Sequence, residues 1–230
     1  MNDRNKCSLS DAPVPIWAND TTVCFLHGFG SDGAEFRKLW RSRGKGPNRL
    51  FLDGPELDAL TSKRRWLPFS NVPETLASGV TAAADLVERE LPEYELPTHL
   101  VLAGHSQGAM VCLELVRRRH INVSAVWCYC GYLPEPLRVP YSDTAGHIEM
   151  HLLWSHKDPF IMLWDVEETA LFFRDQPGMH VHVHVSRSLS HGFSPDWLEA
   201  RNFDINVDLP SHGKLSIEHS FANIKRERGQ

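Results

Sequence analysis

The feature that most constrains this chain is a five-residue turn, Gly104-His-Ser-Gln-Gly108, between an apolar run and a helical pattern. Residues 99–103 are continuously apolar, as in a buried strand, and residues 107–119 carry apolar side chains at helical spacing. The flanking glycines let strand and helix approach closely while the serine between them takes a strained conformation. The turn therefore predicts an α/β fold in which Ser106 is a nucleophile.

The motif by itself is weak, because chains of this composition contain it by chance in roughly 7% of cases. A glycine-rich turn with a capping serine is the alternative, since serine is also a common helix N-cap. The position of Ser106 between strand and helix favours the nucleophile.

Apolar runs and amphipathic stretches alternate along the chain, which is typical of βαβ units on a mostly parallel sheet with helices on both faces. The predicted strands are 21–26, 49–52, 99–103, 123–129, 149–154 and 180–185. The predicted helices are 33–41, 73–91, 107–119 and 161–174, with Asn71 as a cap for the second. The connections leave no room for a large lid domain.

The first predicted strand runs into a glycine-rich loop, His27-Gly-Phe-Gly30. A loop in this place supplies an N–H group that stabilises a developing oxyanion. The predicted donors are the backbone N–H groups of Phe29 and Gln107. A phosphate-binding loop is disfavoured, because the Gly-Lys-Ser/Thr ending and the three-glycine dinucleotide spacing are missing.

A serine nucleophile needs a histidine base and a carboxylate that orients it. Asp158 follows a predicted strand directly, where sites of open α/β sheets form, and His191 lies in the loop after the last strand. Asp143 and Asp165 are rivals for the acid, the first in a loop and the second inside a helical pattern.

Two other groups of residues could bind a metal. His180, His182 and His184 alternate with valines, so they share one face of a strand, as zinc ligands or as the wet face of an edge strand. No carboxylate is obvious beside them in the sequence. Cys128 and Cys130 also share a strand face, but a metal or redox role is disfavoured.

Taken together, the motifs resemble the phospholipase/carboxylesterase family of α/β hydrolases, which includes acyl-protein thioesterases and small bacterial carboxylesterases. The resemblance spans about Thr21 to Trp197. It rests on Leu26–Asp32, Leu50–Pro55 with Arg65-Trp66, Gly104–Ala109, Asp158-Pro159 and Ser190–Gly192.

The resemblance implies the α/β-hydrolase fold, with Ser106, Asp158 and His191 as a catalytic triad and Phe29 and Gln107 as oxyanion donors. It also implies neither metal nor cofactor. His105 departs from the phenylalanine that the family often carries there. A His-Lys pair before the aspartate and a long C-terminal arm are further departures.

Composition limits the remaining options. At 230 residues we expect one domain over 21–201, an N-terminal extension over 1–20 and a C-terminal arm or tail over 202–230. A net charge of −5 gives no reason to expect nucleic acid, and no apolar run is long enough to span a membrane. Five cysteines and the lack of a signal-peptide pattern indicate a cytoplasmic protein. Homodimer formation is left open.

The expected activity is hydrolysis of small acyl esters or acyl thioesters, with Phe29 and Trp66 as substrate-binding residues. Acyl-protein thioesterase and lysophospholipase activities are alternatives, as is a small-molecule receptor with little turnover or an interaction protein that uses its arm. The basic run 63–65 is either a solvated loop or a binding site for an anionic or acyl-bearing substrate.

Overall fold

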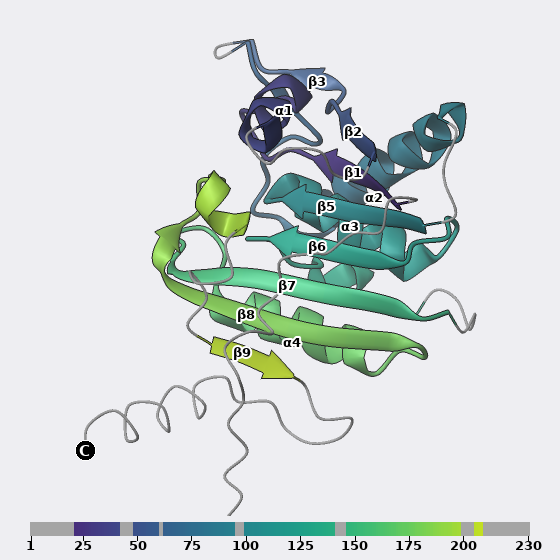
Figure 1. Cartoon of the computed structure of the whole chain (residues 1–230), viewed down its shortest axis with the longest axis vertical. Helices are drawn as coiled ribbons and strands as arrows, with labels where there is room; N and C mark the ends of the chain where they lie inside the picture. The colour runs from purple at the N-terminus through teal and green to yellow at the C-terminus, as the bar shows by residue number, and fades with distance from the viewer. Residues whose placement is uncertain are drawn as a thin grey trace, which may run out of the picture.

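Seven strands form one sheet in the order β2-β1-β5-β6-β7-β8-β9 (Figure 1). The computed structural model describes residues 21–41, 48–59, 62–94, 99–140, 146–198 and 205–208. The strands are β1 Thr21–Leu26, β2 Asn48–Leu52, β5 His99–His105, β6 Ala125–Tyr129, β7 Ile148–Lys157, β8 Met179–Ser190 and β9 Ile205–Asp208. The first six are parallel, and β9 pairs antiparallel with β8.

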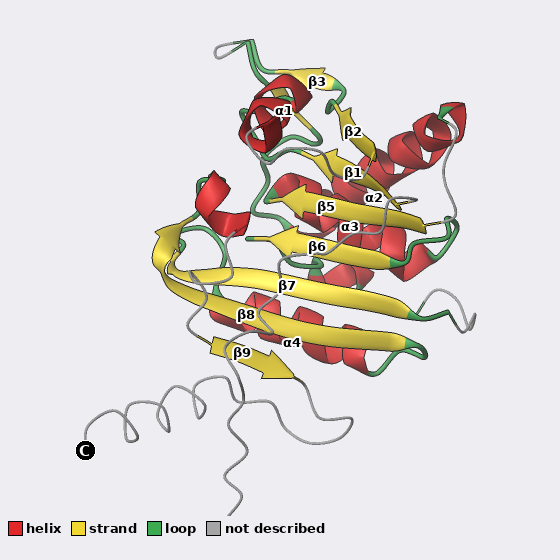
Figure 2. Cartoon of the chain, viewed as in Figure 1, coloured by secondary structure: helices red, strands yellow, loops and turns green. Residues whose placement is uncertain are grey.

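Helices cover both faces of this sheet, as the sequence predicts (Figure 2). The helices are α1 Gly33–Arg41, α2 Pro73–Glu90, α3 Gln107–Arg118 and α4 Leu163–Arg174, with short 3-10 turns η1 Leu91–Glu93, η2 Glu135–Leu137 and η3 Pro195–Leu198. α2, α3 and α4 lie on one face, and α1 and η3 lie on the other. Apolar strands buried between these layers form the core.

The helix α2 begins differently from the prediction. Its N-cap is Val72, which makes no side-chain capping hydrogen bond, so the predicted cap by Asn71 is wrong. Pro73 occupies the first turn, where its missing N–H would have no partner inside the helix and its fixed φ already suits the helix. The start of α2 is therefore set by the backbone geometry of Pro73, and the helix is stabilised by burial of its apolar face, which includes Val80 and Val87.

The sheet extends further than the periodicity predicts. β7 and β8 continue past the predicted ends to Lys157 and Ser190, with an irregularity in the pairing between Ser155 and Lys157. β9 comes from the segment predicted to be an arm or tail, so β8 is flanked on both sides and is not an edge strand. A two-stranded hairpin of β3 Glu56–Leu57 and β4 Arg64–Arg65 was also unforeseen, because strands this short carry no periodicity.

The described loops at the carboxyl edge of the sheet contain no inserted lid domain. Among the described helices, none is long and apolar enough to cross a membrane. Residues 1–20 and 209–230, which include most of the predicted extension and arm, lie outside the described part of the chain.

Candidate active site

Ser106 lies at the junction of β5 and α3 in a conformation that few non-glycine residues adopt. Its φ is 53° and its ψ is −116°, so the backbone at this residue is strained. A side chain at Gly104 would come within 2.4 Å of the Gly108 carbonyl oxygen, and one at Gly108 within 2.2 Å of the Leu26 carbonyl oxygen. Both glycines of the motif are thus required by close backbone contact.

The structure joins Ser106 to His191 and Asp158 in one chain of hydrogen bonds. Ser106 Oγ lies 3.0 Å from His191 Nε2, and His191 Nδ1 lies 2.8 Å from Asp158 Oδ2. Because a carboxylate only accepts, Nδ1 carries a proton and Nε2 is left to accept from the serine hydroxyl. The three residues come from three segments, after β5, β7 and β8, whose carboxyl ends meet at one edge of the sheet.

The Asp158 carboxylate is buried and held by several donors. Its Oδ1 accepts hydrogen bonds from the backbone N–H groups of Phe160 at 2.9 Å and Ile161 at 3.0 Å. Burial by itself would raise its pKa, but the hydrogen bonds from His191, from these two N–H groups and from Cys130 lower the pKa overall. Asp158 is therefore charged at neutral pH and fixed in one orientation.

Of the two rival acids, the structure describes only Asp165, which is not part of this chain of hydrogen bonds. Asp165 lies on α4, and burial raises its pKa. Asp143 lies outside the described residues.

The loop after β1 and the first turn of α3 lie beside Ser106. A Cβ added to Gly28 would come within 3.3 Å of the Ser106 Cβ, so the backbone that leads into Phe29 runs next to the serine. Gln107 is the first residue of α3, where backbone N–H groups have no partner inside the helix and carry partial positive charge. Phe29 is 47% exposed, which leaves its ring open to a ligand.

A buried hydrogen-bond network behind the loop was not foreseen from the sequence. The indole N–H of Trp66 donates to the His27 carbonyl oxygen at 2.9 Å, and His27 Nε2 accepts from the Gly54 N–H at 2.9 Å. His27 therefore carries its proton on Nδ1, which donates to the Gly28 carbonyl oxygen at 2.8 Å. Burial lowers the His27 pKa, so the ring is neutral and the loop is tied to its neighbours.

Trp66 and Gln107 complete this support. Gln107 donates from Nε2 to the Leu67 carbonyl oxygen at 2.9 Å and accepts from the Trp66 N–H at 3.1 Å. Trp66 is 2% exposed, and its ring lies against His27. This burial argues against the predicted contact of Trp66 with a substrate and makes its side chain a support of the loop.

His105, which departs from the family pattern in the sequence, contacts His191 directly. Its Nε2–H donates to the backbone carbonyl oxygen of His191 at 2.6 Å, and its ring lies near those of Phe36 and Phe193. Burial, with a smaller contribution from His191, lowers the pKa of His105 to about 4. A phenylalanine could fill this space but could not make the hydrogen bond.

The basic run 63–65 is paired within the chain. Lys63 binds Asp32 and Glu35, Arg64 reaches the Gly54 carbonyl oxygen, and Arg65 binds Glu56. These contacts hold the β3–β4 hairpin against the loop after β1. They support a structural role for the run over a substrate-binding one.

Cys128 and Cys130 do not share a strand face. Cys128 lies in β6 with its Sγ 3.8 Å from the Ala109 carbonyl oxygen on α3. Cys130 follows the strand with a φ of 51° and interacts with Asp158. Burial raises the pKa of both thiols, so neither is a ready thiolate.

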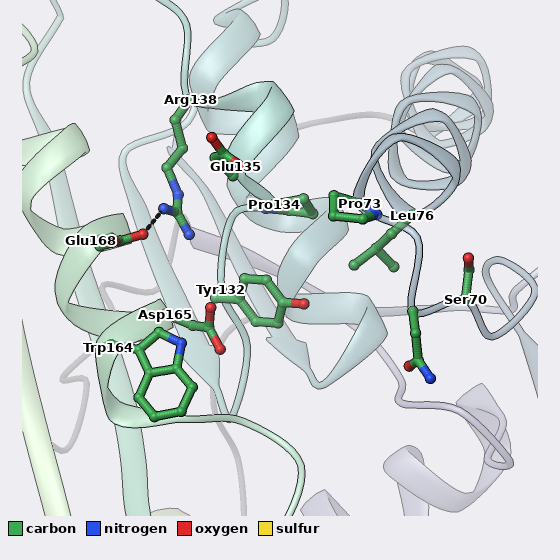
Figure 3. Close-up of a pocket in the computed structure, with 11 residues that line it drawn as sticks. Ser70, Pro73, Leu76, Tyr132, Pro134, Glu135, Arg138, Trp164, Asp165 and Glu168 are labelled. Atoms are coloured by element: carbon green, nitrogen blue, oxygen red, sulfur yellow. Dashed lines mark hydrogen bonds and ion pairs between the residues drawn. The ribbon is translucent and has the colours of Figure 1, made fainter.

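Two cavities lie on the part of the surface formed by α1, α2, η2 and α4. One, of about 380 Å³, lies on the α1 side, and its lining combines the apolar Phe29, Phe36, Leu39 and Phe193 with the polar Ser31, Glu35, Lys38 and His105. The other, of about 520 Å³, lies between α2, η2 and α4 and presents Tyr132, Asp165 and the Arg138–Glu168 ion pair (Figure 3). Ser106 lines neither cavity, but the cavity on the α1 side reaches the adjacent His105.

Comparison with known proteins agrees with the fold. The chain is similar to acyl-protein thioesterase 1 of Schizosaccharomyces pombe, with 24% identity over 162 residues, 64% of this chain and 72% of that protein. The Bacillus cereus carboxylesterase aligns with a TM-score of 0.64 and 16% identity over 81% of this chain and 88% of its own. The esterase PE8 aligns with a TM-score of 0.65 and 20% identity over 80% and 91%. These two likenesses show the shared fold.

A family described as phospholipase/carboxylesterase matches residues 14–203, which is most of the chain. The match includes the β5–α3 turn and the segments that carry Asp158 and His191. The chain therefore belongs to the phospholipase/carboxylesterase family.

Proposed function

We propose that the chain is a serine hydrolase that cleaves carboxylic esters, and thioesters by the same route, through an acyl-enzyme on Ser106. The observation that carries the proposal is the pair of distances from His191, 3.0 Å to Ser106 Oγ and 2.8 Å to Asp158 Oδ2. The strained turn and the free N–H groups at the start of α3 support it.

In the first step His191 Nε2 takes the proton of the Ser106 hydroxyl as Oγ attacks the substrate carbonyl carbon. The oxyanion that forms accepts hydrogen bonds from the N–H groups of Phe29 and Gln107. Each such donor contributes about 3 kcal/mol to the stability of the transition state. The charge of Asp158 stabilises the imidazolium, and its Oδ2 keeps the ring in place.

In the second step the protonated His191 gives its proton to the leaving alcohol or thiol as the bond to the acyl group breaks. A water molecule then takes the place of the leaving group, and His191 removes its proton as it attacks the acyl carbon. Release of the carboxylic acid returns the proton to Ser106.

The acyl chain has a suitable location in the cavity on the α1 side. Phe29, Phe36 and Phe193 give it an apolar lining, and Phe29 is also a proposed oxyanion donor. A carbonyl carbon held at Ser106 could therefore direct its acyl chain into this cavity. The cavity of Figure 3 suits an acyl chain less well, because four charged side chains line it, Glu135, Arg138, Asp165 and Glu168, against Glu35 and Lys38 in the cavity on the α1 side.

Labelling by a fluorophosphonate probe tests the nucleophile. We expect the full chain to be labelled and Ser106→Ala to be unlabelled, with Ser70→Ala as a matched control that labels like the wild type. Equal labelling of Ser106→Ala would refute the proposal. If the chain is labelled but turns over no p-nitrophenyl acyl ester, the result would instead favour a small-molecule receptor with little turnover.

A chain-length series tests the acyl cavity. Leu39→Trp places a larger side chain in the lining, so we expect the preferred acyl chain to become shorter. Leu76→Trp, in the lining of the cavity in Figure 3, is the control and should leave the preference unchanged. If only Leu76→Trp changed the preferred acyl chain length, the acyl chain would be assigned to the cavity in Figure 3 instead.

Thioester cleavage is the second candidate, favoured by the similarity to a protein named acyl-protein thioesterase 1. Matched pairs of oxygen esters and thioesters with one acyl group separate the two activities. A kcat/KM that is higher for the thioester at every chain length would identify a thioesterase.

A further inference from the structure

A second group of histidines lies at the amino-terminal ends of β7 and β8, the two strands that Asp158 and His191 follow. His180 at the start of β8 pairs in register with Glu149 on β7, so both side chains lie on one face of the sheet. His147 lies two residues before Glu149, and its ring centroid is 4.4 Å from that of His180. The sequence gives no sign of this carboxylate, because Glu149 is 31 residues from His180 in the chain.

These three residues bring suitable ligand atoms together. One ligand atom from each of His147, Glu149 and His180 lies within 4.8 Å of the other two. Two imidazoles and a carboxylate are the ligand set of many zinc sites, with ligand atoms about 2.0–2.2 Å from the ion. In a tetrahedral site neighbouring ligand atoms would be about 3.3 Å apart, so small side-chain rotations suffice.

The hydrogen bonds of Glu149 orient it for this role. Its Oε1 accepts from His147 Nε2 at 2.7 Å, and its Oε2 accepts from His182 Nε2 at 3.0 Å. An ion would replace the proton that now lies between His147 and Glu149, and that proton would move to His147 Nδ1 through solvent. His182 would stay as the partner that fixes the carboxylate, as is usual around metal ligands.

The surrounding side chains keep this face of β7 and β8 in order. His151 Nδ1 lies 3.0 Å from His184 Nε2, and the His151 ring stacks on His182 and on Trp127, with centroids 4.9 and 3.9 Å away. The inner histidines thus form a packed row beside the three outer ligands. His147 and His180 are exposed, so an ion can reach them from solvent.

We propose that His147, Glu149 and His180 bind one divalent ion of the zinc class, held by a carboxylate that His182 orients. The ion would join the starts of β7 and β8. Glu149 lies near the start of the extended β7 and Asp158 directly after its end, nine residues later, which is about 30 Å. The ion would therefore stabilise the fold without taking part in the reaction at Ser106.

Zinc titration of the full chain by calorimetry, after dialysis against a chelator, tests this proposal. We expect one ion per chain, at least tenfold weaker binding in Glu149→Gln and His180→Ala, and about tenfold weaker binding in His182→Ala. Cobalt should give the visible absorption of a low-symmetry site in the wild type and lose it in Glu149→Gln. Zinc should raise the Tm of the wild type and not that of the triple variant His147→Ala/Glu149→Gln/His180→Ala.

Two controls separate this site from other histidines. His99→Ala removes an exposed histidine elsewhere and should bind zinc like the wild type. His191→Ala matters more, because Cys130, Asp158 and His191 also bring three ligand atoms within 4.8 Å of one another. Loss of binding in His191→Ala but not in His180→Ala would overturn the proposal, as would wild-type binding no tighter than that of the triple variant.

Discussion

Histidine and carboxylate side chains meet at both ends of the paired strands β7 and β8, but the two groups differ in burial and in their neighbours. At the carboxyl end Asp158 is buried and accepts hydrogen bonds from two backbone N–H groups. It also orients His191 toward Ser106. At the amino end Glu149 is partly exposed and lies between His147 and His182, and no serine or cysteine is among its hydrogen-bond partners in the described part of the chain. The same residue types therefore suit acid–base chemistry at one end and ion binding at the other, because burial and neighbours differ.

The largest expected effect is on turnover, which should depend on the carboxyl ends of β7 and β8 and not on their amino ends. Ser106→Ala should lower kcat by about 10⁶-fold, since the nucleophile and its base act as one unit. His180→Ala, at the amino end of β8, should leave kcat/KM within about twofold of the wild type because its expected effect falls in the surface range. Hydrolysis of a p-nitrophenyl ester measures both, and a large loss in His180→Ala would break the comparison.

The two carboxylates provide the next test. Asp158→Asn should lower kcat by about 10⁴-fold, because the amide no longer stabilises the imidazolium or selects its tautomer. Glu149→Gln should leave kcat unchanged. Steady-state kinetics on the two purified variants, with matching circular dichroism spectra, decide the point, and similar losses in both would mean that the ends are coupled.

His105, at the carboxyl end, should make the free energy of unfolding depend on pH. Its pKa falls from 6.5 to about 4 on folding, so between these values the unfolded chain binds a proton that the folded protein does not. Stability from this group is present above pH 6.5 and is lost as the pH falls, by about 2 kcal/mol between about pH 7.5 and about pH 5. In His105→Phe the stability lost between these two pH values should be smaller by this amount.

Chemical unfolding at the two pH values measures this difference. His120→Ala, at an exposed histidine paired with Glu88, is the control and should keep the wild-type loss. An unchanged pH dependence in His105→Phe would show that folding does not lower the pKa of His105.

The smallest expected effect concerns the support of the loop after β1. Trp66→Phe removes the hydrogen bond to the His27 carbonyl oxygen, which contributes about 1 kcal/mol, so kcat should fall about fivefold. Trp164→Phe, at an exposed tryptophan on α4, should change kcat little. A higher KM with unchanged kcat in Trp66→Phe would instead restore the predicted contact of Trp66 with the substrate.

Local patterns in the sequence were enough to predict the six parallel strands, the four helices and the position of Ser106 between β5 and α3. Burial on both faces makes central strands continuously apolar, and each helix repeats its apolar face every three to four residues. Strand ends, the capping of α2 and the short β3–β4 hairpin were beyond these patterns. They depend on pairing partners that are distant in the sequence.

By itself, the sequence determined which residue types follow which strands, and therefore that a serine, an aspartate and a histidine end up at one edge of the sheet. Tertiary structure decided which contacts these and other residues make. It joined His105 to the His191 backbone, buried Trp66 against His27 and set Glu149 beside His180. Such contacts follow from the register of neighbouring strands and the closure of loops, which no window of the sequence contains.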